Sequence, residues 1–147
     1  MNNPSIRAQV SEIEIAFIAG FFDGEGCISI GKNGSVDIGI VNTSKINLEY
    51  IYKIFGGSLN KRSQKINKTQ YIYRLYGENA INFLTVMEPY LLDKKEQAHT
   101  IAEYFKLRNE ISTIRIPGKK GAFANPDREV LVSTFREILS EQKKEEH

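Results

Sequence analysis

Two carboxylates that follow an apolar segment are the first residues in this sequence with the means for chemistry. Asp23 and Glu25 come directly after the run FIAGFF, and a glycine follows each of them. If that run is a helix, Glu25 lies at its C-terminus, beside backbone carbonyls that carry partial negative charge. A carboxylate is unfavourable there unless a cation joins it. The pattern therefore predicts a Mg²⁺ site of oxygen ligands, built from this carboxylate, a nearby carbonyl, water and substrate phosphates.

Small residues on the same predicted helix indicate how that site is completed. Ala16, Ala19 and Gly20 lie among bulky apolar residues, and small side chains allow a second helix to approach closely. That helix belongs either to the same chain, which is a common arrangement, or to a second copy across a dimer interface. Packing against a twofold copy brings two Glu25 side chains to the bottom of a shared groove. Two metal ions in such a groove clamp the attacking and leaving oxygens of a phosphodiester.

Capping, turn and periodicity signals predict the elements that position these residues. Ser11 and Glu14 form a capping-box pattern that starts the first helix, and Asn33-Gly34 is a strong turn signal between two alternating strands. Ser44 is a candidate N-cap for the next helix. The predicted order begins with a helix that covers 11–22 and stops at Glu25. It continues with a hairpin over 27–41, a helix over 44–57, a second hairpin over 58–77, a helix over 78–91 that breaks near Pro89, a helix over 93–111, a basic loop over 112–126 and a last helix over 127–147.

This order predicts an α+β fold in one domain, residues 1–147. Four strands form an antiparallel sheet, helices cover one of its faces, and the other face meets solvent or a partner. The hydrophobic share of 41% and the charged share of 26% are typical of a globular chain. Cys27 is the single cysteine, so no internal disulfide forms, and no apolar run or signal-peptide pattern indicates a membrane or secreted protein. We therefore expect an intracellular protein, cytoplasmic or organellar.

The distribution of charge, rather than the net charge of +2, indicates a partner. No acid interrupts the basic residues between Glu49 and Glu78, and side chains of this kind neutralise phosphates and contact base edges. A two-stranded ribbon also fits the major groove. The alternative is that the lysines only keep a hairpin edge soluble. The candidate DNA contacts are Ser29, Gly31, Lys32, Asn33 and Asp37 on the first hairpin, Lys61, Arg62, Gln64, Lys65, Lys68, Gln70 and Arg74 on the second, and Arg115, Lys119 and Lys120 in the basic loop.

Three segments resemble one family. IAGFFDGEG, Ile18 to Gly26, resembles the signature motif of the LAGLIDADG homing endonucleases, and the segments 42–57 and 83–98 are similar to the family's second helix and to the region after its second hairpin. The resemblance covers about residues 13 to 106. It implies an α-β-β-α-β-β-α core whose sheet forms a saddle over DNA, with a C-terminal helix added. A chain with one motif is implied to be a homodimer that binds a long pseudo-palindromic target and hydrolyses one phosphodiester in each strand.

The resemblance also implies roles for individual residues. Glu25 matches the metal-binding acid of the motif, with glutamate in place of the commoner aspartate, and Gly24 would lend its backbone carbonyl. Lys94 matches a lysine near the scissile phosphate, whereas Asp23 matches a structural acid. The residue that orders catalytic water is Asn42, Thr43 or Ser44. The implied cofactor is Mg²⁺, with Mn²⁺ substituting and Ca²⁺ binding without cleavage.

Two other functions on the same fold stay open. One is a maturase that assists splicing of intron RNA, and the other is a DNA-binding regulator that does not cleave. The presence of both Glu25 and Lys94 favours an endonuclease, because a metal-binding carboxylate serves no purpose in a pure DNA-binding groove.

Overall fold

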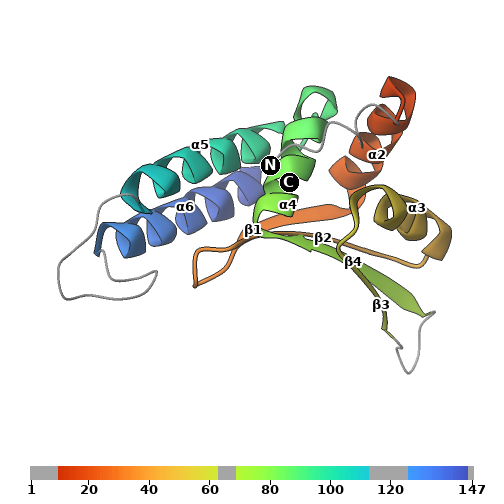
Figure 1. Cartoon of the computed structure of the whole chain (residues 1–147), viewed down its shortest axis with the longest axis horizontal. Coiled ribbons are helices and arrows are strands. Elements are labelled where there is room, and N and C mark those ends of the chain that lie inside the picture. Colours follow the sequence, from red (N-terminus) through yellow and green to blue (C-terminus); the bar gives the residue numbers. More distant parts are fainter. Residues whose placement is uncertain (1–9, 63–68, 113–125, 146–147) are drawn as a thin grey trace.

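The computed structural model describes residues 10–62, 69–112 and 126–145, and their arrangement is α+β (Figure 1). Helices lie over one face of a four-stranded antiparallel sheet whose strand order is β1-β2-β4-β3. The predicted fold class is therefore confirmed. The elements are α2 (Glu12–Glu25), β1 (Gly26–Ile30), β2 (Val36–Asn42), α3 (Lys45–Phe55), β3 (Ser58–Arg62), β4 (Gln70–Tyr76), α4 (Gly77–Met87), a 3₁₀ turn η1 (Glu88–Tyr90), α5 (Lys95–Ser112) and α6 (Pro126–Glu145).

The start of α2 has the predicted capping box. The Ser11 hydroxyl accepts a hydrogen bond from the Glu14 backbone N–H at 3.2 Å, and the Glu14 carboxylate accepts one from the Ser11 N–H at 3.3 Å. These bonds satisfy donors that the first turn of a helix leaves without partners. The Tyr50 hydroxyl of α3 also donates to Glu14, which ties the two helices together. The sequence signal thus fixes where the motif helix begins.

The ends of α3 follow the predicted signals only in part. Gly56 and Gly57 stop the helix with φ values of 72° and 93°, a backbone region that glycine adopts readily. Ser44 occupies the N-cap position, but its side chain makes no capping hydrogen bond with a described residue. The Asn42 side chain accepts the Ser44 N–H at 2.8 Å instead. Ser44 is therefore the N-cap residue of α3 as predicted, but the hydrogen bond that closes this turn is accepted by the Asn42 side chain.

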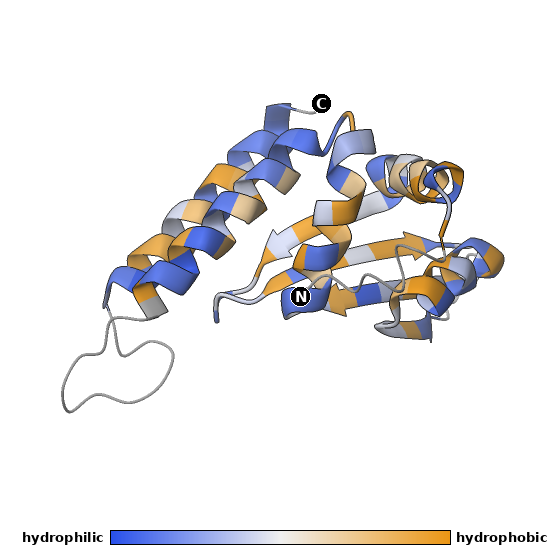
Figure 2. Cartoon of the chain, turned by 45° about the horizontal axis from the view of Figure 1, so that its top comes forward, coloured by the Kyte–Doolittle hydropathy of each residue, from blue (hydrophilic) through white to orange (hydrophobic). Residues whose placement is uncertain are grey.

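The two faces of the sheet differ sharply in composition. One face packs beneath the helices, and its side chains are almost fully buried; they are Ile28, Ile30, Ile38, Ile40, Tyr73 and Leu75. The opposite face, called the open face below, consists of Cys27, Ser29, Asp37, Gly39, Val41, Ser58, Asn60, Arg62, Gln70, Ile72, Arg74 and Tyr76. Figure 2 shows apolar and polar residues alternating along the strands. Ser29 and Asp37, two candidate DNA contacts of the first hairpin, thus lie on the face opposite the buried Ile28 and Ile38.

The last two helices, α5 and α6, form a hairpin beside the sheet (Figure 1). Tyr104 is fully buried and contacts the Phe135 ring, with 5.4 Å between the ring centroids. Val132 and Leu139 of α6 belong to the same buried cluster as the sheet residues. The helical hairpin therefore shares one hydrophobic core with the rest of the described chain. No described helix has both the length and the apolar character of a membrane span.

Candidate active site at the end of the motif helix

The end of α2 leaves Glu25 and Gly24 accessible. Both residues are exposed, and a Cβ atom added at Gly24 would meet no atom within 4 Å. Gly26 follows as the C-cap, and a Cβ atom there would lie 2.2 Å from the Phe22 ring, so only glycine fits. The last carbonyls of a helix have no partners within it. The exposed carboxylate of Glu25 therefore lies beside backbone carbonyl oxygens that have no hydrogen-bond partner within the helix.

Asp23 has a different environment from Glu25. Its carboxylate accepts three backbone hydrogen bonds, from Leu92 at 2.8 Å, Asp93 at 3.0 Å and Lys94 at 2.8 Å. These three N–H groups directly precede α5, where an anion is favourable. Asp23 thus joins the end of the motif helix to the start of α5, which is the structural role expected for it.

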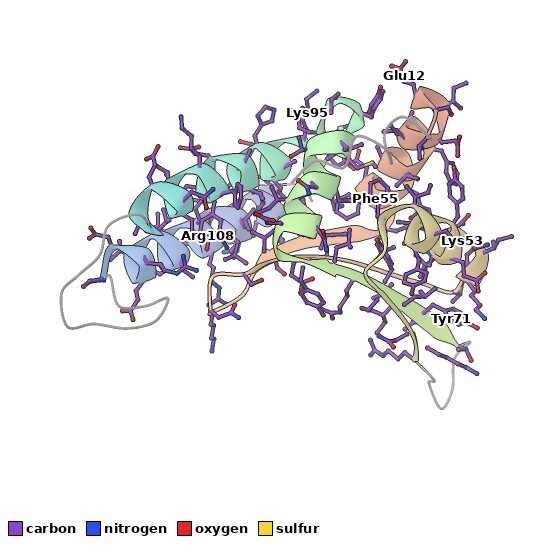
Figure 3. All side chains as sticks on the ribbon, viewed as in Figure 1. Glu12, Lys53, Phe55, Tyr71, Lys95 and Arg108 are labelled. Carbon is purple, nitrogen blue, oxygen red and sulfur yellow. The ribbon has the colours of Figure 1, made fainter. Side chains whose placement is uncertain are left out.

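Lys94 is packed against the same helix end. It is only 8% exposed, and its ammonium group donates a hydrogen bond to the Asp23 carbonyl at 2.6 Å. A cation is favourable at the C-terminus of a helix. Its neighbour Lys95 is exposed and projects from the outer side of α5 (Figure 3). The structure therefore separates two lysines that the sequence alone leaves adjacent.

The donors at this helix end fit a hard divalent cation. One exposed carboxylate, Glu25, and one exposed peptide unit, Gly24, offer oxygen ligands. Mg²⁺ commonly takes one or two carboxylates and completes its shell with water and substrate phosphates. The described residues contain no cluster of three or more His, Cys, Asp or Glu side chains that could hold a metal. A site at Glu25 therefore fits Mg²⁺ shared with a substrate better than a closed structural metal.

The three candidates for ordering water lie at the same end of the sheet as Glu25. Because Gly26 pairs with Ile40 in an antiparallel ladder, the residues that follow on β2 extend past the start of β1. Asn42 is half-buried and its side-chain oxygen is used by the β2–α3 turn, whereas Thr43 is exposed. This leaves the hydroxyls of Thr43 and Ser44 and the Asn42 amide nitrogen as the groups available to water.

The structure gives the second hairpin the parity that the sequence left open. Arg62, Gln70 and Arg74 lie on the open face, whereas Lys61 pairs with Tyr71 and shares the helix side with it. In the first hairpin, Lys32 and Asn33 form the exposed turn, and the Asn33 side chain accepts the Ser35 N–H at 3.0 Å. Six predicted contacts lie outside the described residues; they are Gln64, Lys65, Lys68, Arg115, Lys119 and Lys120.

Asp37 and Arg74 form an ion pair on the open face. The Arg74 Nη1 lies 3.1 Å from Asp37 Oδ2, and Asp37 Oδ1 is buried without a hydrogen-bond partner among the described residues. Burial raises the pKa of the Asp37 carboxyl above its ordinary value, and the Arg74 guanidinium only partly opposes this. The pair therefore places an acid on the open face, whose basic residues in the described strands are Arg62 and Arg74.

The outer side of α2 differs from the interface predicted from small residues. Ala16 and Gly20 are exposed as expected, together with Ile13 at 82% and Phe17 at 50%. Ala19 is fully buried in the core of its own chain, so the prediction that it lies at a dimer interface is wrong. The reason is the helical period, since Ala19 shares the inward side with Ile15, Ile18 and Phe22.

Leu92 is a surface residue that the sequence analysis missed. Its side chain is 85% exposed, and its backbone N–H donates to Asp23. It therefore lies beside the end of α2, and it adds an apolar side chain to the surface near Gly24. The sequence held only a weak signal that one leucine of this pair is exposed. Leu91 and Leu92 are adjacent and precede Asp93, and only one of two adjacent side chains can point into the core.

The chain is similar to known proteins in both sequence and fold. The family model of the LAGLIDADG-like domain matches residues 12–88, which is just over half of the chain. The chain belongs to the LAGLIDADG family. The resemblance predicted from the motif is confirmed, and the matched region contains α2, the whole sheet and α4.

Solved structures of homing endonucleases share the fold. One is I-CvuI in complex with the I-CreI target, at 19% identity and a TM-score of 0.64, over 89% of this chain and 82% of that chain. Another is I-TnaI, at 16% identity and a TM-score of 0.58, over 93% of this chain and all of that chain. No curated protein sequence matches the chain significantly. At these identities the likeness concerns the fold, and it extends to the α5–α6 hairpin outside the matched family region.

Proposed function

We propose that this protein is a site-specific double-strand DNA endonuclease of the homing type. In this proposal residues 1–147 form one endonuclease domain that acts as a homodimer on a long pseudo-palindromic target. The observation that carries it is the contrast at the end of α2, where Asp23 is fully engaged and Glu25 is exposed. The structure of I-CvuI with the I-CreI target, which was determined with Mg and shows DNA that is not cleaved, supports DNA as the bound partner.

The chain's own residues have distinct tasks in this function. Glu25 and the Gly24 carbonyl would hold Mg²⁺, which when bound supplies Lewis-acid stabilisation of the phosphodiester and a more acidic water. The buried Lys94 ammonium places a fixed positive charge at the same helix end, where it stabilises negative charge that develops on the scissile phosphate. Thr43 or the Asn42 amide orients the attacking water. Mn²⁺ would substitute for Mg²⁺, and Ca²⁺ would support binding without cleavage.

The open face of the sheet is the proposed DNA-binding surface. It presents Arg62, Gln70 and Arg74 together with small residues such as Ser29 and Gly39. Arginine and glutamine side chains form paired hydrogen bonds with base edges in the major groove, and cationic groups neutralise phosphates. The first hairpin offers few long side chains, so most of the base contacts would come from β4 and the end of β3.

The outer side of α2 is the proposed dimer interface. Ile13, Ala16, Phe17 and Gly20 expose apolar and small groups along one side of the helix. Leu92 is a further exposed apolar residue, and its backbone N–H binds Asp23 at the end of the same helix. Gly20→Leu tests the interface cleanly, because a Cβ atom at Gly20 meets nothing within 4 Å of its own chain. The variant should fold normally and sediment as a monomer. A variant that dimerises as well as the parent would refute this interface.

The decisive experiment compares the two acids of the motif. A random-site DNA library is incubated with the protein and Mg²⁺, and the cut ends are sequenced to find the target. Plasmid nicking and gel-shift assays on that target then compare the parent with Glu25→Gln. Cleavage should fall by at least about a thousandfold, because the variant loses its anionic ligand for Mg²⁺. DNA binding should persist or tighten, because a negative charge leaves the groove.

Two further variants separate catalysis from folding. Asp23→Asn should lower the melting temperature, because a neutral amide is a weaker acceptor for three N–H groups than a carboxylate. Lys94→Met should slow cleavage, and Lys95→Met serves as the matched control with unchanged rate. Full cleavage by Glu25→Gln would overturn the catalytic assignment. DNA binding without any cleavage by the parent would favour the non-cleaving regulator.

A further inference from the structure

A hollow of about 270 Å³ lies between the turn of the first hairpin and α6. Its lining residues are Lys32 from the turn and Glu129, Val132, Ser133 and Arg136 from α6. Each of the four α6 positions lies three or four residues from two of the others, so they form one side of the helix. This hollow, called the turn–α6 cleft below, lies outside both the motif-helix end and the open face of the sheet.

The turn that forms one wall of the cleft is held firmly in place. The Gly34 carbonyl accepts hydrogen bonds from the buried Tyr104 hydroxyl at 2.6 Å and from Arg108 Nη1 at 3.1 Å. Gly34 has a φ of 87°, and a Cβ atom there would lie 3.1 Å from both Tyr104 and Val132. The close packing fixes the position of the turn relative to α5 and α6. Lys32 is therefore held next to α6 by the fold rather than by its own contacts.

The charged groups of the cleft indicate an anionic ligand. Lys32 and Arg136 are exposed, and neither makes an ion pair or hydrogen bond within the part of the chain that the structure describes. Ser133 adds a hydroxyl donor between them. Glu129 is the one acid in the lining, so two cations face a single carboxylate. A guanidinium that binds two oxygens at once, an ammonium and a hydroxyl together suit a phosphate group.

We propose that the turn–α6 cleft binds one phosphodiester of the DNA backbone, beyond the bases that the open face contacts. This inference rests on the proposed function. The argument for DNA rather than free phosphate is continuity, because Lys32 belongs to the turn between β1 and β2, whose Ser29 and Asp37 lie on the open face. A duplex that follows the sheet toward this turn passes the cleft, and α6 then extends the footprint of the sheet.

Salt-dependent binding tests the cleft. The parent, Arg136→Gln and Lys32→Gln are titrated with the labelled target duplex at several salt concentrations, and binding is followed by fluorescence anisotropy. The plot of log K against log salt has a negative slope. Loss of one phosphate contact should make this slope less steep by about 0.9 for each chain bound. The two cation variants should bind the duplex more weakly than the parent, whereas Glu129→Gln should bind it more tightly. Lys53→Gln, an exposed lysine of α3 that projects away from the sheet (Figure 3), is the matched control with the parent's slope.

A second arm distinguishes DNA from free phosphate. Melting temperatures of the parent and Arg136→Gln are compared in sodium phosphate and in sodium chloride of equal ionic strength. Equal melting temperatures in the two salts support the DNA backbone as the ligand, whereas a phosphate-specific rise that Arg136→Gln removes would overturn it in favour of a free anion. If the parent binds DNA and both Arg136→Gln and Lys32→Gln keep its salt slope, the cleft does not bind a backbone phosphate, and the proposed function still stands. A parent that binds no DNA overturns the proposed function as well.

Discussion

The two faces of the sheet share the same strands but differ in almost every physical property. The helix face is a close-packed layer of isoleucine, leucine and tyrosine side chains, while the open face mixes arginine, glutamine, small residues and one ion pair. Neighbouring residues on a strand therefore have different surroundings: one side chain packs in the core, and the next lies on the face that we propose binds DNA. Substitutions on the two faces should accordingly alter different observables.

The largest effect is expected at the centre of the helix face. Ile38 is fully buried, and Ile38→Ala should lower the free energy of unfolding by about 2–5 kcal/mol through lost burial and a cavity. Val41→Ala lies three residues along the same strand on the open face, with 38% of the residue exposed, and should change stability much less. Urea unfolding of both variants checks this contrast. Equal losses in the two variants would contradict the division between the faces.

The next effect concerns DNA affinity and compares adjacent residues of β3. Arg62 lies on the open face and Lys61 on the helix side. Arg62→Gln should make the slope of log K against log salt less steep by about 0.9 for each chain bound. Lys61→Gln should change this slope less. The measurement is fluorescence anisotropy at several salt concentrations. If Lys61→Gln had the larger effect, the opposite face of β3 would be the one that contacts DNA.

A smaller effect is expected from a polar group on the helix face. The Tyr73 hydroxyl is buried and has no hydrogen-bond partner among the described residues. Burial, with the nearby Tyr52, raises the pKa of the Tyr73 phenol above its ordinary range. Tyr73→Phe should therefore raise the free energy of unfolding by about 1 kcal/mol, because it removes an unsatisfied buried group. A clear loss of stability in thermal melting would show that the hydroxyl has a partner such as bound water.

The smallest effect is expected at Asp37, the acid of the open face. Its pKa is raised by burial, so the folded chain binds this proton more tightly than the unfolded chain does. Stability therefore falls as pH rises through the interval above the ordinary value of about 3.9. Asp37→Asn removes this loss, so its stability relative to the parent should be higher at pH 7 than at pH 4. Urea midpoints at the two values check the sign, and the opposite order would mean that the Arg74 pair dominates.

The sequence predicted the features that depend on local signals. The capping box of Ser11 and Glu14, the turn at Asn33-Gly34 and the inward Ile28 and Ile38 were all recoverable from neighbouring residues. The end of the motif helix was predicted for the same reason, since glycines bracket Glu25. The order of helices and strands then predicted a sheet with helices on one face, and the family resemblance implied the α-β-β-α-β-β-α core.

The features that the sequence did not predict depend on contacts between distant segments. Ala19 was placed on the wrong side of α2 because small residues mark both inward and outward packing. The difference between Lys94 and Lys95 required the position of Asp23, which is about seventy residues away. The turn–α6 cleft combines Lys32 with residues more than ninety positions later, so no periodicity could reveal it.

The hydrogen bonds that attach α5 to the N-terminal half have a consequence for folding. Asp23 accepts from residues 92–94, and Gly34 accepts from Tyr104 and Arg108, so the sequence separations are 69 to 74 residues. Closing the first of these loops lowers the chain entropy substantially, but the second then spans only about ten residues along each segment. Once Asp23 has captured the start of α5, the turn and the rest of the helix dock with little further entropic penalty. The C-terminal end of α2 and the hairpin turn should therefore become ordered in one kinetic step.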